Sequence, residues 1–257
     1  YVTKPLDFPV VLARVNAQLG LKAANDQVRA LARDVERRNE FIRGVFGRYL
    51  TDEIAETLLD SPEGLNLGGE RREITILFAD IRGFTNISSQ RKPEEVVTLV
   101  NNFLSTMTGV IMRYGGTIDE FIGDAILAVF GAPQHREDDA DRAVRCALAM
   151  QAAMAEINQA NEADGLPAVA TGIALNTGKV IAGNIGSERR SKYGFVGHPM
   201  NVTSRIEDQS AGGEILVADT TLAQLSNNYR VTDTRELKVK GIDQLVVVHR
   251  IEGPDHD

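Results

Sequence analysis

Two aspartates lie at positions where their carboxylates could bind a ligand together. Asp80 ends the apolar run EITILFAD, and Asp124 lies at the tip of the hairpin that GTIDEFIGD and AILAVFG predict. If the two strands are neighbours in one sheet, both carboxylates lie at the same end of it. Adjacent carboxylates repel each other unless a cation neutralises them, and Mg²⁺ and Mn²⁺ prefer such oxygen ligands. The pair therefore predicts a divalent metal site.

The residues that follow Asp80 are suited to phosphate. In the stretch IRGFT, Gly83 permits a close approach of the backbone, and the helix expected after it presents free N–H groups. Each aspartate alone has a commoner explanation, Asp80 as a helix cap and Asp124 as a turn residue. Together with Gly83, Phe84 and Thr85, the pair favours a metal–triphosphate site.

Composition limits the class of protein. The chain has 257 residues, 43% of them hydrophobic and 25% charged, which is enough for one sizeable core and a small appendage. No run approaches the ~18 uncharged apolar residues of a membrane span, and we expect a cytoplasmic protein without membrane insertion. A formal charge of −8 without a long basic stripe argues against a nucleic acid partner. The single cysteine, Cys146, lies in a helical apolar pattern, which predicts a buried thiol.

Strands and helices alternate between residues 71 and 253. Beyond the strand and hairpin already described, we expect helices at 93–115, 137–160 and 198–208, a second hairpin at 169–186, and strands at 213–218, 229–232, 236–240 and 245–251. The economical interpretation is a ferredoxin-like βαββαβ core with extra strands. This is an α+β sandwich with two helices on one face of a mainly antiparallel sheet.

A seven-residue repeat precedes this domain. One seam of the repeat holds Leu21, Val28, Val35, Ile42 and Tyr49, and the other holds Ala24, Leu31, Arg38 and Val45. β-Branched residues on the first seam favour a parallel two-stranded coiled coil over residues 21–50. The alternative is a single helix lying on the next domain, because Ala24 and Arg38 weaken the second seam. Pro and Gly in residues 51–70 predict a linker.

The first 20 residues carry a resemblance of their own. VTKP followed by the amphipathic pattern FPVVLARVNAQL resembles the last strand-to-helix segment of a response-regulator receiver domain. The resemblance implies that a receiver domain, served by a sensor kinase, lies upstream. Phosphorylation would then change the packing of the helix at 21–50 and so regulate the domain that follows.

Five motifs of the main domain resemble, in order, those of the class III nucleotidyl cyclase catalytic domain. They lie between residues 78 and 242 and are FADIRGFT, GGTIDEFIGDAILAVFG, IALNTGKVIAGNIG, VGHPMNVTSRIE and LKVKGI. The resemblance implies a homodimer with composite active sites, which fits the heptads. It also implies two divalent metal ions, Mg²⁺ or Mn²⁺, held by Asp80, Asp124 and the backbone of Ile81.

The same resemblance assigns roles to three further residues. Asn201 and Arg205 match a pair that orients the ribose and neutralises the α-phosphate, and their spacing puts both on one face of a helix. Lys240 matches a lysine that binds the terminal phosphates. These three would come from the subunit opposite to the one that holds the metals, so a monomer would have no complete site. His198, which replaces a frequent aspartate, is expected to be structural.

Base choice is expected to depend on Glu120 and Gly194. In the family, adenylyl cyclases usually have lysine at the first position, whereas guanylyl cyclases have glutamate there and a small residue at the second. A carboxylate can accept from both N1–H and N2–H₂ of guanine but meets a lone pair on adenine N1, a difference of ~1 to 3 kcal/mol. Glu120 thus favours GTP over ATP. Gly194 has no side chain to donate to guanine O6, so ATP stays an alternative.

Two other functions are considered. A catalytically degenerate domain could serve as a dimeric regulatory module, but of the seven positions that the resemblance carries over for metal, base, ribose and phosphate contacts, all except Gly194 hold functional side chains. A diguanylate cyclase would also use metal carboxylates on a related sheet, but its GGDEF-type signature is interrupted in GGTIDEF.

Overall fold

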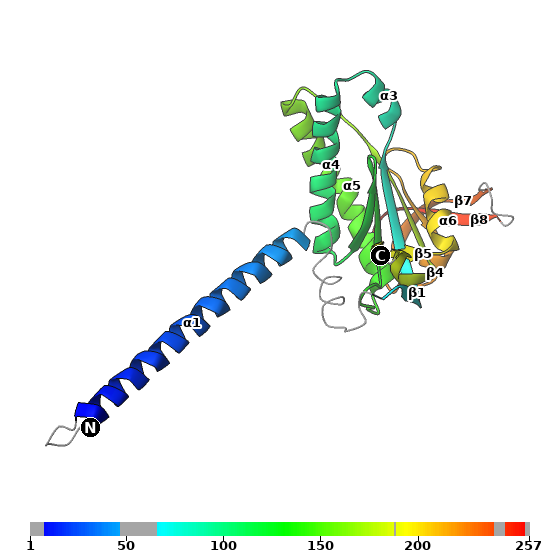
Figure 1. Ribbon diagram of the computed structural model, residues 1–257. Helices are drawn as coiled ribbons and strands as arrows, with labels where there is room; N and C mark the ends of the chain where they lie inside the picture. The colour runs from blue at the N-terminus through cyan, green and yellow to red at the C-terminus, as the bar shows by residue number, and fades with distance from the viewer. Residues whose placement is uncertain (1–7, 47–65, 188, 239–244, 255–257) are drawn as a thin grey trace. The chain divides into compact units, whose positions relative to one another are not determined.

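A computed structural model describes most of the chain, namely residues 8–46, 66–187, 189–238 and 245–254, with only the backbone of residues 39–46. The chain divides into two compact units, residues 1–55 and 56–257 (Figure 1). Parts of the expected receiver segment, coiled coil and linker lie outside the described residues, and so does Lys240.

The first unit contains one long helix, α1 (Phe8–Phe46), of 39 residues. The helix continues through residue 20, so the predicted boundary between receiver segment and coiled coil falls inside it. Predicted seam residues that are more than half exposed in this unit are Leu21, Val28, Leu31 and Val35. A partner surface would be needed to bury such a row of apolar side chains.

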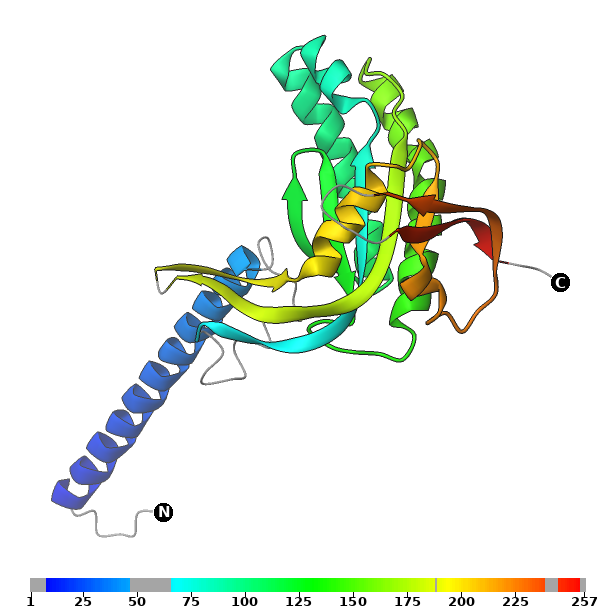
Figure 2. The same ribbon diagram turned by 90° about the vertical axis from the view of Figure 1, so that its right-hand side faces the viewer.

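The second unit is built on one eight-stranded sheet (Figure 2). Its strands are β1 (Gly68–Ile81), β2 (Thr117–Ile122), β3 (Ala125–Phe130), β4 (Thr171–Ser187), β5 (Arg190–Val196), β6 (Ile215–Ala218), β7 (Tyr229–Leu237) and β8 (Val246–Pro254). Their order is β2-β3-β1-β4-β6-β8-β7, with β5 paired to β4. β1 is antiparallel to β3 and β4, and β2 is antiparallel to β3. The order β2-β3-β1-β4 is the predicted ferredoxin-like arrangement.

Helices cover both faces of the sheet. α4 (Pro93–Arg113) and α5 (Asp139–Ala163) share a buried core with one face, and α6 (His198–Glu207) packs on the other with residues of β4, β6 and β8. Two short helices are α3 (Phe84–Ser89) and α7 (Asp219–Leu222). The two long helices share one face as predicted, whereas α6 adds a layer on the opposite face.

Helix α4 is the one helix among the described residues that is long and apolar enough to span a membrane by length and composition alone. Phe103 and Met107 of α4 are fully buried in the core with Phe130 of β3 and Met150 of α5. This packing accounts for the apolar composition of the helix.

The start of α5 is fixed by a buried carboxylate. Asp141 accepts hydrogen bonds from the backbone N–H groups of Ser226 (2.9 Å) and Asn227 (3.2 Å), from Asn227 Nδ2 (2.7 Å) and from the Tyr229 hydroxyl (3.1 Å). Burial raises the pKa of Asp141, but these hydrogen bonds outweigh it and hold the pKa below its usual value. Cys146 on the same helix is fully buried, as predicted, and burial raises its pKa to about 12.

The predicted hairpin at 169–186 is wrong. Residues 171–186 belong to the single strand β4, and the hairpin is formed by β4 with β5. The stretch Asn176-Thr177-Gly178 resembles a turn, but it pairs along β1, with Asn176 opposite Ile76 and Thr177 opposite Thr75. Pairing with a long neighbouring strand therefore overrides the local turn preference. In the same way β7 runs without a break from Tyr229 to Leu237, so it joins the strand expected at 229–232 to the first residues of the one expected at 236–240.

Candidate active site

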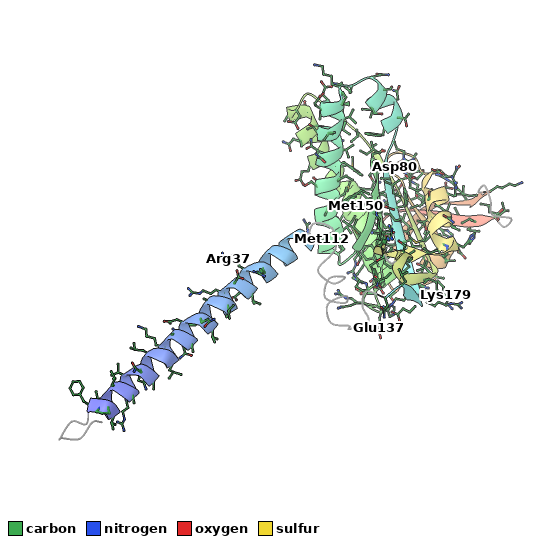
Figure 3. All side chains as sticks on the ribbon, in the orientation of Figure 1. Arg37, Asp80, Met112, Glu137, Met150 and Lys179 are labelled. Atoms are coloured by element: carbon green, nitrogen blue, oxygen red, sulfur yellow. The ribbon has the colours of Figure 1, made fainter. Side chains whose placement is uncertain are left out.

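The two predicted metal aspartates lie together at one end of the sheet. Ala79 of β1 pairs with Ile126 of β3, so the residues just beyond them, Asp80 and Asp124, share that end. Figure 3 shows Asp80 at the end of β1, away from Lys179 of β4. Burial, followed by the adjacent carboxylate of Asp80, raises the pKa of Asp124 to about 7.

This pair fits a hard divalent cation. Asp124 Oδ2 is buried and has no hydrogen-bond partner among the described residues. Asp80 Oδ1 accepts from the Ile81 N–H at 2.9 Å, which fixes the carboxylate at the strand end. In the described part of the chain no cluster of three or more His, Cys, Asp or Glu side chains forms a metal site. The ligands available here are therefore two carboxylates, backbone carbonyls such as that of Ile81, and substrate oxygens.

The predicted phosphate segment forms a tight turn into α3. Gly83 has φ 72°, a left-handed conformation that favours glycine, and its carbonyl accepts from the N–H groups of Asn86 (3.0 Å) and Ile87 (3.1 Å). Phe84 and Thr85 are thus the first residues of a short helix that starts beside Asp80. Phe84 packs partly against the main core, and Thr85 is exposed.

Asn201 and Arg205 share the exposed face of α6, as predicted. Their neighbours Val202 and Ile206 are buried against the sheet. Arg205 Nη1 lies 3.2 Å from Asp208 Oδ2, and about half of each side chain is exposed. Within the described part of the chain, no hydrogen bond or ion pair joins Asn201 or Arg205 to the two aspartates.

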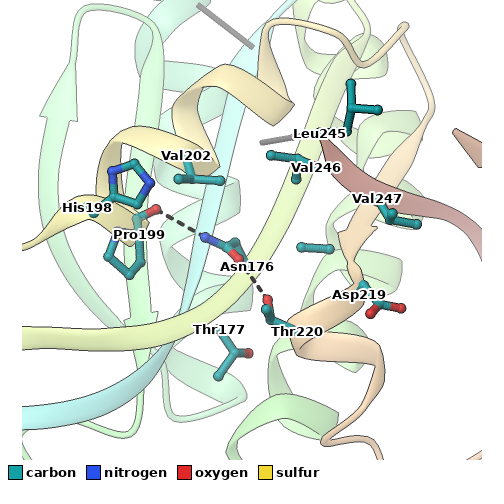
Figure 4. Close-up of a pocket in the computed structure, with 11 residues that line it drawn as sticks. Asn176, Thr177, His198, Pro199, Val202, Asp219, Thr220, Leu245, Val246 and Val247 are labelled. Atoms are coloured by element: carbon teal, nitrogen blue, oxygen red, sulfur yellow. Dashed lines mark hydrogen bonds between the residues drawn. The ribbon is translucent and has the colours of Figure 1, made fainter. Parts of the chain in front are cut away.

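The start of α6 is held by a residue that the sequence did not single out. Asn176 of β4 donates from Nδ2 to the Pro199 carbonyl (3.2 Å) and accepts from the Thr220 hydroxyl (2.9 Å), as Figure 4 shows. His198 is at the first position of the helix and lines a cavity of about 330 Å³ with these residues. Asn176 therefore positions the helix that carries Asn201.

An ion pair links the far end of α6 to the segment after Asp80. The guanidinium of Arg82 contacts the carboxylate of Glu207, which is 2% exposed, and also donates to the Glu207 carbonyl at 3.3 Å. The backbone N–H of Arg82 donates to the carbonyl of Ala170 at 2.8 Å. The end of β1 that carries Asp80 is thereby tied to the last turn of the helix that carries Arg205. Nothing in the local sequence around either residue indicates this pairing.

Glu120 lies on an edge strand and not in the core. β2 forms the end of the sheet, and about half of the Glu120 side chain is exposed. Its Oε2 lies 3.3 Å from Nζ of Lys192 on β5, and the same Nζ lies 3.5 Å from Oδ1 of the buried Asp119. Burial raises the pKa of Asp119, an effect that Lys192 partly offsets. A Cβ built on Gly194 would lie 3.2 Å from Lys192 Cε, so Gly194 and Glu120 border one group of side chains.

The comparisons with known proteins all indicate the same protein family. Residues 69–253 match the sequence profile of the adenylate and guanylate cyclase catalytic domain. The chain is 30% identical over 210 residues to "Adenylate cyclase 1" of Rhizobium meliloti, covering 81% of this chain and 32% of that protein. It spans about a third of the length of the curated relatives it matches.

Two solved structures are similar over about three quarters of this chain. The guanylyl cyclase Cya2 has a TM-score of 0.71 and 47% identity, over 74% of this chain and 96% of that one. The adenylyl cyclase CyaB from P. aeruginosa has a TM-score of 0.68 and 33% identity, over 74% and 99%.

Proposed function

Because this chain belongs to the adenylate and guanylate cyclase catalytic domain family, we propose that it converts GTP to 3′,5′-cyclic GMP and pyrophosphate at sites shared between two subunits. The family and the named relatives make it an adenylyl or guanylyl cyclase domain. The choice of GTP and the arrangement of the site are the proposal. The observation that carries the choice is the carboxylate of Glu120, half exposed on β2 and four residues before Asp124.

Glu120 supports guanine through hydrogen-bond complementarity. Its two oxygens can accept from guanine N1–H and N2–H₂, whereas adenine N1 would turn a lone pair toward them. The greater identity to the guanylyl cyclase Cya2, 47% against 33% for the adenylyl cyclase CyaB, points the same way.

Asp80, Asp124 and the Ile81 carbonyl would hold two divalent ions. When bound, these ions would lower the pKa of the ribose 3′-hydroxyl and neutralise charge on the triphosphate. Gly83, Phe84 and Thr85 offer backbone N–H groups beside the same carboxylates, where the phosphate chain would lie.

Asn201 and Arg205 would act on a substrate held by the other subunit. The amide of Asn201 orients the ribose, and the guanidinium of Arg205 neutralises the α-phosphate as its charge grows. Both side chains are exposed on one helix face and make no bond to the aspartates of their own chain among the described residues. Such a pair is available to a partner, and Lys240 of the same subunit would bind the terminal phosphates.

The long helix α1 supports a dimer. Its exposed row of apolar residues would be buried by pairing with the same helix of a second copy as a parallel coiled coil. We extend the proposal to regulation: an upstream receiver domain, phosphorylated by a sensor kinase, would change this pairing and so align the two half-sites. A longer form whose activity is unchanged when the acceptor aspartate is replaced would contradict this.

Product analysis tests the function. The protein at high concentration is incubated in Mn²⁺ with GTP, ATP, CTP or UTP separately, with Asp80→Ala as the matched control. We expect cyclic GMP as the main product and none from the variant, because the variant loses a metal ligand. Cyclic AMP as the main product would establish the adenylyl alternative, and no cyclic product from any nucleotide would favour a degenerate regulatory module.

A further inference from the structure

Arg82 lies between the metal-binding and the phosphate-binding residues proposed at the end of β1. It directly follows Ile81, whose carbonyl would be a metal ligand, and it precedes Gly83, where the turn into α3 begins. Its backbone N–H donates to the carbonyl of Ala170 at 2.8 Å. The backbone of Arg82 is therefore held by the segment that leads into β4, while its side chain extends to another element.

The guanidinium of Arg82 holds the last turn of α6. It contacts the carboxylate of Glu207 and donates to the Glu207 carbonyl at 3.3 Å. The same carbonyl accepts from the backbone N–H and from the hydroxyl of Ser210, both at 2.9 Å. A cation at the last carbonyls of a helix also interacts favourably with the negative end of the helix dipole. Arg82 Nε is buried and has no hydrogen-bond partner among the described residues, so the polar contacts of this guanidinium lead to Glu207.

Gly172 of β4 leaves the space that the guanidinium occupies. A Cβ at this position would lie 2.7 Å from both Nε and Nη2 of Arg82 and would overlap the hydroxyl of Ser210. A larger residue at 172 would therefore displace the arginine. Gly172 also pairs with Asp80 across β1 and β4. The arginine is thus packed directly beside the strand pair that places Asp80.

Arg205 and Glu207 lie on opposite sides of α6. Residues two apart in an α-helix are separated by about 200° around its axis. Glu207 accordingly faces inward and is 2% exposed, whereas about half of the Arg205 side chain is exposed. The contact with Arg82 therefore fixes the helix from its buried side and leaves Arg205 accessible from outside.

We propose that Arg82 is a positioning residue that serves both active sites of the dimer at once. This inference rests on the shared sites of the proposed function, in which the aspartates of a chain serve one site and its Arg205 serves the other. Through its backbone, Arg82 places Asp80 and Ile81 for the metal ions of the first site. Through Glu207 it places Arg205 for the α-phosphate of the second. A displacement of about 1 Å can cost about 100-fold in rate, so loss of this contact affects both sites.

The alternative is that Arg82 only stabilises the fold. The two roles differ in the double variant Arg82→Met/Glu207→Met, in which no buried charge is left unpaired and most of the stability is expected to return. If stability is the only role, activity returns with it. If Arg82 positions the two half-sites, the folded double variant stays impaired, because the polar contact between the end of β1 and α6 is absent.

The experiment uses heterodimers that have one working site. An Asp80→Ala chain, which supplies Arg205, is paired with an Arg205→Ala chain, which supplies the metal ligands. The second site of such a heterodimer lacks both groups, and each homodimer is expected to be inactive. Arg82→Met is then placed in one of the two chains at a time, and kcat, KM for GTP and the half-saturating Mn²⁺ concentration are measured. Arg230→Met, at a surface ion pair of β7, is the matched control.

Each placement should give its own kinetic signature. In the chain that supplies Arg205, Arg82→Met should lower kcat about 10- to 100-fold with KM for GTP changed less than about threefold, because Arg205 acts on charge that develops in the transition state. In the chain that supplies the metal ligands, it should raise the half-saturating Mn²⁺ concentration about tenfold, as expected for a residue that orients metal ligands. Arg82→Lys, which keeps a cation, should restore part of both losses, and Arg230→Met should match the parent heterodimer.

A second readout does not depend on turnover. Electron paramagnetic resonance measures the binding of Mn²⁺ alone to the wild-type homodimer and to the Arg82→Met homodimer. We expect about tenfold weaker binding to the variant, for the same reason as in the kinetic assay. If Arg82→Met does not fold by circular dichroism, the double variant Arg82→Met/Glu207→Met takes its place in both readouts.

The results that overturn this inference are specific. The same kinetic change from either chain, or a double variant with both native stability and native kinetics, would make Arg82 a structural residue, while the GTP proposal would stand. An inactive parent heterodimer beside an active wild-type homodimer would show that the sites are not shared, and the role in two sites would fail. If the wild type makes no cyclic product from any nucleotide, the proposed function fails, and an unchanged Mn²⁺ affinity in Arg82→Met would then also refute the positioning of the metal ligands.

Discussion

The ion pair between Arg82 and Glu207 gives a quantitative test of how the site is held. Glu207 is 2% exposed and Arg82 is 26% exposed, so Arg82→Met would leave a carboxylate buried without its cation. Breaking a buried pair by removing one partner costs about 3 to 5 kcal/mol. Because water reaches Arg82, we expect the lower end, about 3 kcal/mol. For a domain of this size that loss lowers Tm by roughly 6 to 12 °C.

The assay is thermal and urea unfolding of the sheet unit, followed by circular dichroism. Arg230→Met is the matched control, since Arg230 pairs with Glu252 at the surface, where the side chains are 60% and 36% exposed. It should change the free energy of unfolding by less than about 1 kcal/mol. The double variant Arg82→Met/Glu207→Met should recover most of the loss, because no buried charge is left unpaired. If Arg82→Met is no more harmful than Arg230→Met, the structural role given to this pair is wrong.

Three further predictions follow from other parts of the molecule. The hydrogen bonds to Asp141 lower its pKa in the folded state despite burial. The contribution of Asp141 to the free energy of unfolding is therefore complete above the pKa of the unfolded state, near 3.8, and is lost as pH falls through the lower pKa of the folded state. Asp141→Asn should thus cost more stability at pH 7 than at pH 3 in urea unfolding, and an equal cost at both would refute this. Asp80→Ala and Arg205→Ala chains should each be inactive alone, but a heterodimer of the two should regain one working site. Its activity should reach up to about half of that of a wild-type dimer, which has two sites, whereas no recovery would count against shared sites. Val28→Asp with Val35→Asp should weaken the dimer at least tenfold in sedimentation, because two charges enter the seam of α1, and an unchanged dimer would place the interface elsewhere.

The sequence predicts the fold well where local patterns and pairing agree. The ferredoxin-like order arises because the strands before Asp80 and around Asp124 are bounded by clear turns and long amphipathic helices. The similarity to solved cyclase structures confirms the mixed α+β fold. The ends of β1 and β3 bring Asp80 and Asp124 together, so two residues that are far apart in the sequence lie close in space, as predicted.

Long-range effects account for what the sequence does not reveal. Asn176 and Gly178 have turn preferences, but pairing of β4 along β1 keeps them in a strand. The sequence around Glu120 does not indicate that β2 is an edge strand, and this position leaves the side chain half exposed. Lys192 lies far from Glu120 in sequence, and a bulge that no residue pattern announces brings them together.

The central claim is tested most directly by competition between the two purine nucleotides. Equimolar GTP and ATP are offered together to the dimeric protein in Mn²⁺, and both cyclic products are quantified by mass spectrometry at early times. The ratio of products then equals the ratio of the two kcat/KM values. A gain of ~1.4 kcal/mol or more from the match between Glu120 and guanine predicts at least about tenfold more cyclic GMP than cyclic AMP. Equal amounts, or an excess of cyclic AMP, would contradict the assignment of GTP as substrate.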